Sequence, residues 1–141
     1  MIIKQLSVFL ENRSGRLSEM TKLLAKENIN LSALSIAETS EYGIIRTVVS
    51  EPEKAKDLLQ QNNFSVSLTD IICLNMPNKP GSLAEGLDIL SQHDISVEYM
   101  YAFSHGEEAF AIIKTDNLIE TVSILEKEKL DLLQAEELYN I

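Results

Sequence analysis

The sequence has little of what would place the protein outside the cytoplasm or in a membrane. Its 141 residues contain no tryptophan and one cysteine, Cys73. A single cysteine excludes an intrachain disulfide and is typical of a reducing compartment. No apolar run approaches the ~20 residues of a membrane-spanning helix, and residues 1–5 do not begin the basic-then-apolar pattern of a signal peptide. We therefore expect a cytoplasmic protein that has no membrane partner.

Positive charge is scarce in this chain. Twelve lysines and arginines stand against 22 aspartates and glutamates, which gives a formal net charge of −10. Nucleic-acid binding usually leaves a basic footprint, and anionic lipid surfaces attract basic segments. The composition therefore predicts no nucleic-acid partner and a soluble, acidic surface.

Residues for metal binding and catalysis are also few. The two histidines, His93 and His105, fall in different predicted elements, with no cysteine pair or carboxylate cluster at ligand spacing. Ser14 and Ser82 precede predicted helices but lack the G-x-S-x-G frame and the partner histidine of a nucleophile. Cys73 lies in an apolar strand pattern, which favours a small core residue. We expect no metal, no cofactor and no catalytic activity.

The chain contains an internal repeat with an offset of 66 residues. Residues 11–17 (ENRSGRL) return as residues 77–83 (PNKPGSL), and each copy follows a short apolar run and precedes an amphipathic one. The same offset aligns further identical pairs: Asn12 with Asn78, Gly15 with Gly81, Leu17 with Leu83, Glu19 with Glu85, Leu24 with Leu90, Ile29 with Ile95 and Glu41 with Glu107. A register that persists from turn to helix to strand predicts one structural unit present in two copies.

Hydrophobic periodicity predicts the same order of elements in both copies. In the first copy we expect strands at 2–10, 29–37, 44–49 and 64–69, with helices at 17–26 and 50–60. Ser50 and Glu53 have the spacing of a capping box at the start of the second helix. In the second copy we expect strands at 71–76, 95–103, 109–114 and 132–139, with helices at 83–90 and 118–125, the second of them capped by Asp116.

This order, strand–helix–strand–strand–helix–strand, is that of the ferredoxin-like sandwich, in which two helices cover one face of a four-stranded antiparallel sheet. We therefore predict an α+β protein of two βαββαβ domains, residues 1–69 and 70–141. A unit of about 65 residues is marginally stable alone, and only Thr69 and Asp70 join the two predicted strands. We expect the units to pack edge to edge as one eight-stranded sheet, which would hide two exposed edges.

The element order and the two turns resemble the ACT domain, a small amino-acid-sensing module attached to many enzymes of amino-acid metabolism. The first copy is most similar to the regulatory domain of phosphoglycerate dehydrogenase, because Glu11-Asn12-Arg13, one further residue and Gly15, then Ile29-Asn30-Leu31, match its serine-binding turn and strand start. Ser14 stands where that pattern has proline. The second copy keeps Pro80 but has Ser96 in place of Asn30. The resemblance covers nearly the whole chain, as two tandem domains.

In that family, ligands bind between paired ACT domains, where the first turn of one domain faces the start of the second strand of its neighbour. The resemblance therefore implies ligand-binding residues in both turns and both strand starts. They are Asn12, Arg13, Ser14, Gly15, Arg16, Leu17, Asn30 and Leu31 in the first copy, and Asn78, Lys79, Gly81, Ser82, Leu83, Ser96 and Val97 in the second. We favour sites that contain Asn30, because an amide makes more hydrogen bonds than the hydroxyl of Ser96.

The residue types of the turns suit this role on physical grounds. Each turn leads to a helix N-terminus, where unpartnered N–H groups and the helix dipole favour a carboxylate. Gly15 and Gly81 let the backbone approach a ligand closely, and Asn12 and Asn78 offer both a donor and an acceptor. The alternative is purely structural, since glycine and asparagine before a helix are also common turn and cap residues.

We therefore predict a non-catalytic regulatory protein that senses a free amino acid at the interface between ACT-like units. A homodimer is expected, because ferredoxin-like sheets leave one face bare, and an enzyme is a possible partner. The alternative is an interaction protein, similar to the small subunits of branched-chain biosynthetic enzymes, that regulates or holds an enzyme without a ligand of its own. The sequence names neither the amino acid nor the partner.

Overall fold

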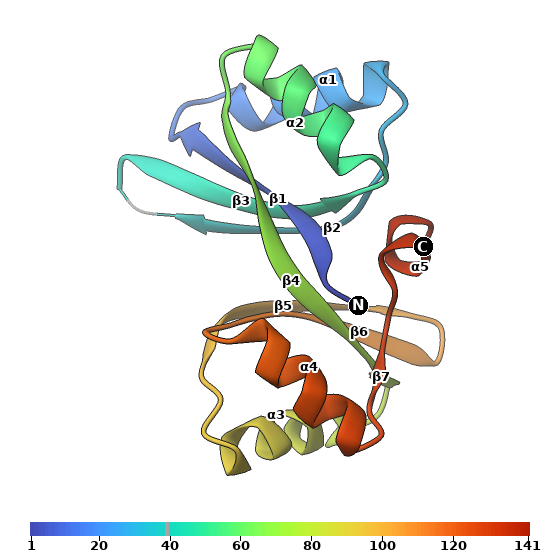
Figure 1. The fold of residues 1–141 in the computed structure, drawn as a ribbon. Coiled ribbons are helices and arrows are strands. Elements are labelled where there is room, and N and C mark those ends of the chain that lie inside the picture. The colour runs from blue at the N-terminus through green and yellow to red at the C-terminus, as the bar shows by residue number, and fades with distance from the viewer. Residues whose placement is uncertain (39) are drawn as a thin grey trace. The chain divides into compact units, whose positions relative to one another are not determined.

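The computed structural model describes residues 1–38 and 40–141 and divides them into two compact units. The N-terminal unit comprises Lys4–Thr69 with Tyr139–Ile141, and the C-terminal unit comprises Asp70–Leu138 with Met1–Ile3. Within each unit, two helices lie on one face of the strands (Figure 1). The predicted α+β class and the repeated βαββαβ order are confirmed. Thr39, in the turn expected before the third strand, lies outside the described residues.

The N-terminal unit is built from β1 (Ile3–Glu11), α1 (Arg16–Lys26), β2 (Leu31–Glu38), β3 (Tyr42–Val49), α2 (Pro52–Gln61) and the first part of β4 (Ser65–Pro77). Its strand order is β4-β1-β3-β2, with β3 antiparallel to both β1 and β2. Strand β2 is therefore the edge strand. A hydrogen bond of 2.9 Å between the hydroxyls of Ser7 and Thr69 links β1 to β4.

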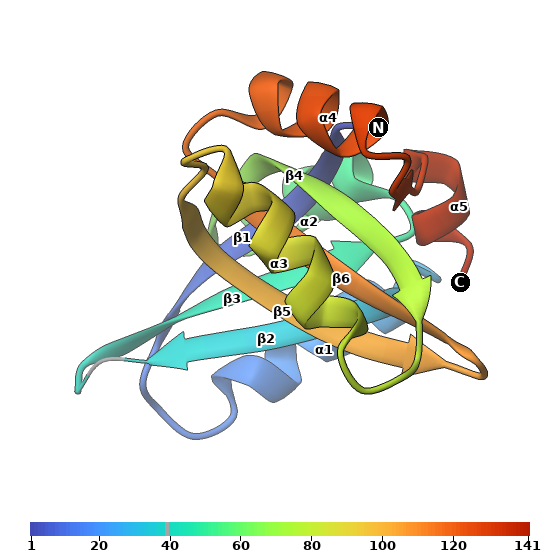
Figure 2. The ribbon, with the colours of Figure 1, turned by 90° about the horizontal axis from the view of Figure 1, so that it is seen from below.

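The C-terminal unit continues with α3 (Ser82–Gln92), β5 (Val97–His105), β6 (Glu108–Thr115), α4 (Leu118–Lys127), β7 (Asp131–Leu132) and α5 (Ala135–Tyr139). Its strand order is β7-β4-β6-β5, with β6 antiparallel to both β4 and β5 and with β7 antiparallel to β4. Figure 2 shows α3 crossing the strands β5 and β6 of this unit. The order repeats that of the N-terminal unit, so the expected four-stranded topology is present twice.

The 66-residue register extends to fine details of the backbone. Among the residues that the structure describes, four non-glycine residues with positive φ form two pairs at this offset, Asn28 (57°) with Asp94 (56°) and Asn63 (66°) with Lys129 (59°). Both edge strands have a β-bulge at the matching place, between residues 31 and 33 and between residues 97 and 99. Residues 66 positions apart therefore occupy equivalent places within their own units and face the same side of their own sheets. The two turns can thus be compared residue by residue.

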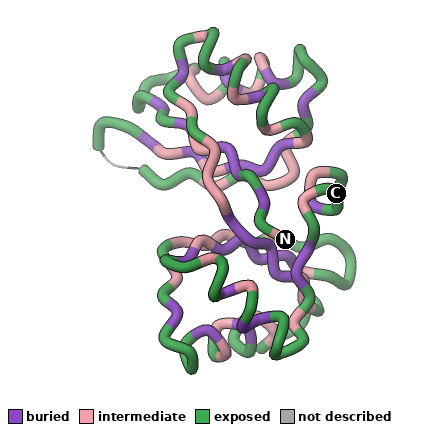
Figure 3. The backbone as a smooth tube through the Cα atoms, in the orientation of Figure 1, coloured by how far each residue is buried: buried purple, intermediate pink, exposed green. Residues whose placement is uncertain are grey.

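Each unit has its own hydrophobic core between its helices and its strands. The N-terminal core contains Leu6, Val8, Leu10, Met20, Leu24, Ile29, Ile45, Val49, Ala55, Leu59 and Phe64. The C-terminal core contains Ile72, Leu74, Leu90, Ile95, Ala111, Ile113, Ile124, Leu125 and Leu132. Figure 3 shows long buried stretches along the strands and mostly exposed turns. Because each fully buried large aliphatic side chain stabilises by about 1.5–3 kcal/mol, these cores hold the turns in place.

We expected eight strands, and the described residues form seven. The strands predicted at 64–69 and 71–76 form one continuous strand, β4 (Ser65–Pro77). No glycine, proline or asparagine separates them, and Thr69 and Asp70 continue the extended backbone without a turn. Strand β4 thus begins in the N-terminal unit and ends in the C-terminal unit.

The last predicted strand, 132–139, is wrong beyond Leu132. Residues Ala135–Tyr139 form helix α5. The Gln134 N–H donates to Glu137 Oε2 at 2.7 Å, which is half of a capping box, and two glutamates lie in the first turn. The apolar pattern of this segment, which suggested a strand, is equally compatible with a short helix whose buried side carries Leu138.

The capping box predicted for α2 is also wrong. Residue Glu51 is the N-cap and makes no side-chain cap bond. The Ser50 hydroxyl instead accepts a hydrogen bond of 3.0 Å from the Asn30 N–H, and the Ser50 N–H donates to the Asn30 carbonyl at 3.0 Å. Ser50 thus fixes the backbone just before β2. None of the described helices is both long and apolar enough to cross a lipid bilayer.

Candidate functional site

The two repeated turns adopt the same backbone conformation. Helix α1 begins after Gly15 (φ 87°) and α3 begins after Gly81 (φ 93°), both in the left-handed region. An added Cβ would meet no atom within 4 Å at either position, so the backbone angle rather than crowding favours glycine. The Asn12 N–H donates to the Glu41 carbonyl at 3.0 Å, and the Asn78 N–H donates to the Glu107 carbonyl at 2.8 Å.

Neither repeated turn caps its helix with a side chain. Both N-cap residues are glycine, and no side-chain cap bond is present at α1 or α3. At α4, by contrast, the N-cap is Asn117 and not the expected Asp116, and Asn117 Oδ1 accepts from the Glu120 N–H at 3.1 Å. The first N–H groups of a helix have no intrahelical partner and carry the positive end of the helix dipole. The Ser82 N–H at the start of α3 already donates to the Lys79 carbonyl at 3.2 Å, so an anionic group from outside the helix would be received by the N–H groups that follow Ser82.

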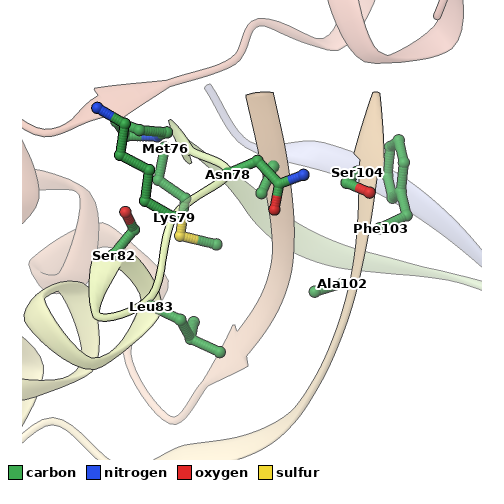
Figure 4. A pocket seen from close by; sticks show the side chains of 10 residues that line it. Met76, Asn78, Lys79, Ser82, Leu83, Ala102, Phe103 and Ser104 are labelled. Carbon is green, nitrogen blue, oxygen red and sulfur yellow. The ribbon is translucent and has the colours of Figure 1, made fainter. Parts of the chain in front are cut away.

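A cavity of about 290 Å³ lies beside the turn of the C-terminal unit. Figure 4 shows the Asn78 amide directed from the turn toward β5, with Lys79 extending away from that strand. The lining residues come from the turn, the start of α3 and the adjoining strands: Met76, Pro77, Asn78, Lys79, Ser82, Leu83, Ala102, Phe103, Ser104 and Ala109. Among them, Lys79 is the one residue with a charged side chain.

The topology explains why these residues meet. Strands β4 and β5 are both antiparallel to β6, so they run parallel and end at the same edge. Met76, Ala109 and Ser104 pair across the three strands in one row. The neighbouring row of Leu74, Ala111 and Ala102 faces the same side, which is the side of the helical core. Small side chains on β5 thus leave space between that strand and the start of α3.

The predicted strand-start residues of the same unit lie elsewhere. Ser96 and Val97 line a second cavity of about 500 Å³, with Leu87, Leu90, Ser91, Asp94, Ile95 and Met100. This cavity lies at the C-terminal end of α3 and the beginning of β5, whereas the turn lies at their opposite ends. One unit alone therefore does not bring Ser96 and Val97 together with Asn78.

The charged residues of the N-terminal turn interact with the protein itself. Arg13 Nε lies 3.2 Å from Glu11 Oε2. The Arg16 guanidinium donates to Glu19 Oε2 at 3.0 Å and to the Asn63 carbonyl at 3.2 Å, and it lies 3.8 Å from the centre of the Phe64 ring. With only 10% of its side chain exposed, Arg16 connects the start of α1 to the chain that follows α2.

The remaining predicted residues of this unit are dispersed. Ser14 is exposed in the turn, and Leu17 packs against the N-terminal core. The Asn12 amide donates to the Ser40 carbonyl at 3.4 Å. Asn30 and Leu31 lie at the start of β2, at the end away from the turn, where Ser50 holds the Asn30 backbone.

The sequence profile of the family described as "ACT domain pair" matches residues 1–141. The chain belongs to the ACT domain pair family. Its predicted resemblance to tandem ACT domains is thereby confirmed over the full length.

Solved structures similar to this ACT domain pair include protein BT0572 from Bacteroides thetaiotaomicron. It is 48% identical, covers 100% of this chain and 98% of its own, and superposes with a TM-score of 0.97. The ligand-free regulatory subunit of aspartate kinase from Thermus thermophilus is 10% identical over 89% of this chain and 93% of its own, with a TM-score of 0.65. At that identity the likeness concerns the fold alone. No curated protein matches the chain.

Sequence reasoning missed six of the ten residues that line the cavity in the second ACT domain. Met76, Ala102, Ser104 and Ala109 carry no turn signal and no charge, and they read as ordinary strand residues. The signal that could have found them was topological. In a βαββαβ unit the first and second strands run parallel with one strand between them, so the end of the second strand lies beside the first turn.

Cys73 is expected to resist thiol reagents in the folded ACT domain pair. Burial, with a smaller contribution from Asp131, raises the pKa of this thiol to about 12, and the residue has no exposed surface. Because the thiolate is the reactive form, labelling by a chromogenic disulfide reagent should be slow in the native protein and fast and stoichiometric in urea. Rapid labelling without denaturant would contradict the core role of Cys73.

Proposed function

We propose that this ACT domain pair is a regulatory protein that binds a free amino acid in the cavity beside Asn78. The observation that supports the proposal is the cavity's combination of an uncapped helix N-terminus, an amide and an apolar wall. Its volume of about 290 Å³ is at the lower end of ligand pockets, which commonly span about 300–1,000 Å³. A molecule of amino-acid size fits such a space.

Each part of a zwitterion finds a complementary group there. The carboxylate would accept hydrogen bonds from the N–H groups that follow Ser82 in the first turn of α3, aided by the positive charge of Lys79. The Asn78 amide would accept from the ammonium or donate to the carboxylate. Met76, Leu83 and the alanines of β5 and β6 would contact the apolar part of the ligand.

A second copy of the chain would complete the site in the way that the family resemblance implies. Ser96 and Val97 lie in a different cavity from the turn of their own unit, so a neighbouring ACT domain is needed to place such a strand start opposite Asn78. We propose that the protein acts as a homodimer and that ligand binding at this contact changes the pairing. A partner enzyme of amino-acid metabolism would then respond to that change.

One observation favours a second candidate function, an interaction subunit without its own ligand. The N-terminal unit exposes large apolar side chains: Phe9 (50%), Leu34 (42%), Ile36 (48%) and Tyr42 (43%). Leu34 and Ile36 belong to the edge strand β2, and the rings of Phe9 and Tyr42 lie 5.9 Å apart. Strand pairing places Phe9 and Tyr42 on the face of the sheet opposite to Leu34 and Ile36, so two separate apolar surfaces are available to another protein.

Thermal unfolding in the presence of each common amino acid at millimolar concentration tests the proposal. A ligand that binds only the folded protein stabilises it by RT ln(1 + [L]/Kd), about 2.7 kcal/mol at a hundredfold excess over Kd. We expect one amino acid, or one chemical group of them, to raise the melting temperature of this protein. The corresponding decarboxylated amine should have no such effect, because it lacks the group that α3 would bind.

No stabilisation by any amino acid would contradict the binding function. Co-purification of a larger enzyme in that case would support the interaction subunit. The substitution Asn78→Ala provides a further check, since it removes the amide from an exposed position without touching the core. Stabilisation by the amino acid should decrease in this variant while the melting temperature without ligand stays close to that of the parent.

A further inference from the structure

We propose that each chain binds one amino acid, in the C-terminal unit only, and that the residues at positions 102 and 104 of β5 decide this. The inference rests on the proposed function and deepens it. The N-terminal unit has the same turn, but Ile36 and Glu38 occupy the equivalent positions of its β2 strand. These two side chains make the first turn unsuitable for a carboxylate ligand.

The equivalence of the two pairs of positions follows from strand pairing. In the C-terminal unit, Ala102 pairs with Ala111 and Ser104 pairs with Ala109. In the N-terminal unit, Ile36 pairs with Ile45 and Glu38 pairs with Gly43, each 66 residues earlier. Both strands carry their bulge at the same place. Positions 36 and 38 therefore face the side of the sheet that holds the cavity in the other unit.

The first difference is electrostatic. Ser104 presents a neutral hydroxyl that can donate to a carboxylate, whereas Glu38 presents a negative charge at the same place. Glu11 also replaces Pro77, and its carboxylate is already paired with Arg13 at 3.2 Å. Arg16, which replaces Ser82, is paired with Glu19 at 3.0 Å. The cations of the N-terminal turn are thus neutralised, and Glu38 adds repulsion toward an anionic ligand.

The second difference is steric. A Cβ built at Gly43 would lie 3.5 Å from Ile36 Cγ2, so the Ile36 side chain lies against the place where Ala109 lines the other cavity. Ala102 has a single methyl carbon there and Ile36 has four side-chain carbons. Gly43 lacks the Cβ that Ala109 has, which frees the volume of one carbon atom, but Ile36 adds three carbon atoms relative to Ala102. Ile36 therefore occupies space that Ala102 leaves open.

Reciprocal variants of the full chain test the inference, with the twenty common amino acids as probes in thermal unfolding. The double variant Ala102→Ile/Ser104→Glu copies the N-terminal residues into the C-terminal unit. It should lose the ligand-induced rise in melting temperature, with an affinity at least tenfold weaker. The matched variant Ile36→Ala/Glu38→Ser changes the N-terminal unit. It should keep the full rise and bind a second ligand per chain, because the two residues that exclude a carboxylate ligand from the first turn are gone. Calorimetric titration of the parent should give one ligand per chain.

The possible results separate this inference from the proposed function. If no amino acid stabilises the parent protein, the proposed function fails and the inference fails with it. If the parent is stabilised but Ala102→Ile/Ser104→Glu retains the effect, or if Ile36→Ala/Glu38→Ser loses it, the inference alone is wrong. Ser104→Glu by itself serves where the double variant does not fold, because Ser104 is exposed and its replacement leaves the core intact.

Discussion

The substitution Met20→Gly is expected to cause the largest loss of stability of any single change considered for this protein. Met20 has no exposed surface and lies in the N-terminal core. Removal of a buried methionine side chain costs about 2–5 kcal/mol, and glycine in a helix interior costs a further ~1 kcal/mol. Urea unfolding should show a midpoint far below that of the parent, since total stability is commonly only about 5–15 kcal/mol.

The repeat makes this result informative, because Gly86 is the equivalent residue in the C-terminal unit. A Cβ at Gly86 would lie 2.8 Å from Leu74 Cδ2, so Leu74 fills the space that a side chain there would take. In the N-terminal unit Val8 stands at the position of Leu74, and valine is too small to fill the space left by Met20. Glycine is therefore suited to one copy and not to the other.

Lys22→Gly is the matched control for Met20→Gly. Lys22 lies in the same helix with an exposed side chain, so its replacement removes helix propensity without opening a cavity. It should lower the free energy of unfolding by only ~1 kcal/mol. Equal losses in the two variants would show that Met20 contributes no packing energy, which would contradict its place in the core.

The substitution Gly81→Val is expected to have the largest effect on ligand binding. Gly81 has a φ of 93°, and the left-handed conformation costs an L-residue roughly 1–2 kcal/mol. A β-branched residue would favour rearrangement of the turn, which would displace Asn78 and the first N–H groups of α3. Ligand-induced stabilisation should decrease by about 1.4 kcal/mol for each tenfold loss of affinity at saturating amino acid.

Gly15→Val provides the comparison for this result. Gly15 has nearly the same φ, 87°, and equally open surroundings, so both variants should lose similar stability without ligand. Only Gly81→Val should lose the response to amino acid. Loss of the response in both variants would place ligand in both turns, and retention in Gly81→Val would remove the C-terminal turn from the site.

Sequence patterns predicted the repeated topology because periodicity and turn residues act locally. The α1 and α3 turns and the order of elements follow from glycine, asparagine and alternating apolar residues. The continuous strand β4 was not predicted. The polar residues Thr69 and Asp70 resembled a connection between two strands, although neither residue forces a turn. Helix α5 was missed because five residues carry too little periodicity to distinguish a helix from a strand.

Only four of the ten residues that line the candidate site were predicted, for a related reason. Asn78, Lys79, Ser82 and Leu83 belong to the recognisable turn. Ala102 and Ser104 matter through their small size and neutrality, and these properties gain meaning only when the strand is placed beside the turn. We favoured sites that contain Asn30 because of the hydrogen-bonding capacity of its amide, without considering the space and the charge around the turn. The cavity directs the proposal to the other copy.

The constant register has a consequence for the history of the chain. From the Asn12 and Asn78 turns to the matching bonds of Phe64 and Leu130, equivalent backbone hydrogen bonds stay 66 residues apart. If the halves arose by tandem gene duplication, neither has kept an insertion or deletion in this span, and they diverged by point mutation alone. Under the proposed assignment, the difference between Ala102 and Ile36 and between Ser104 and Glu38 would then separate the roles of the two halves. One half would bind ligand and the other would take part in assembly.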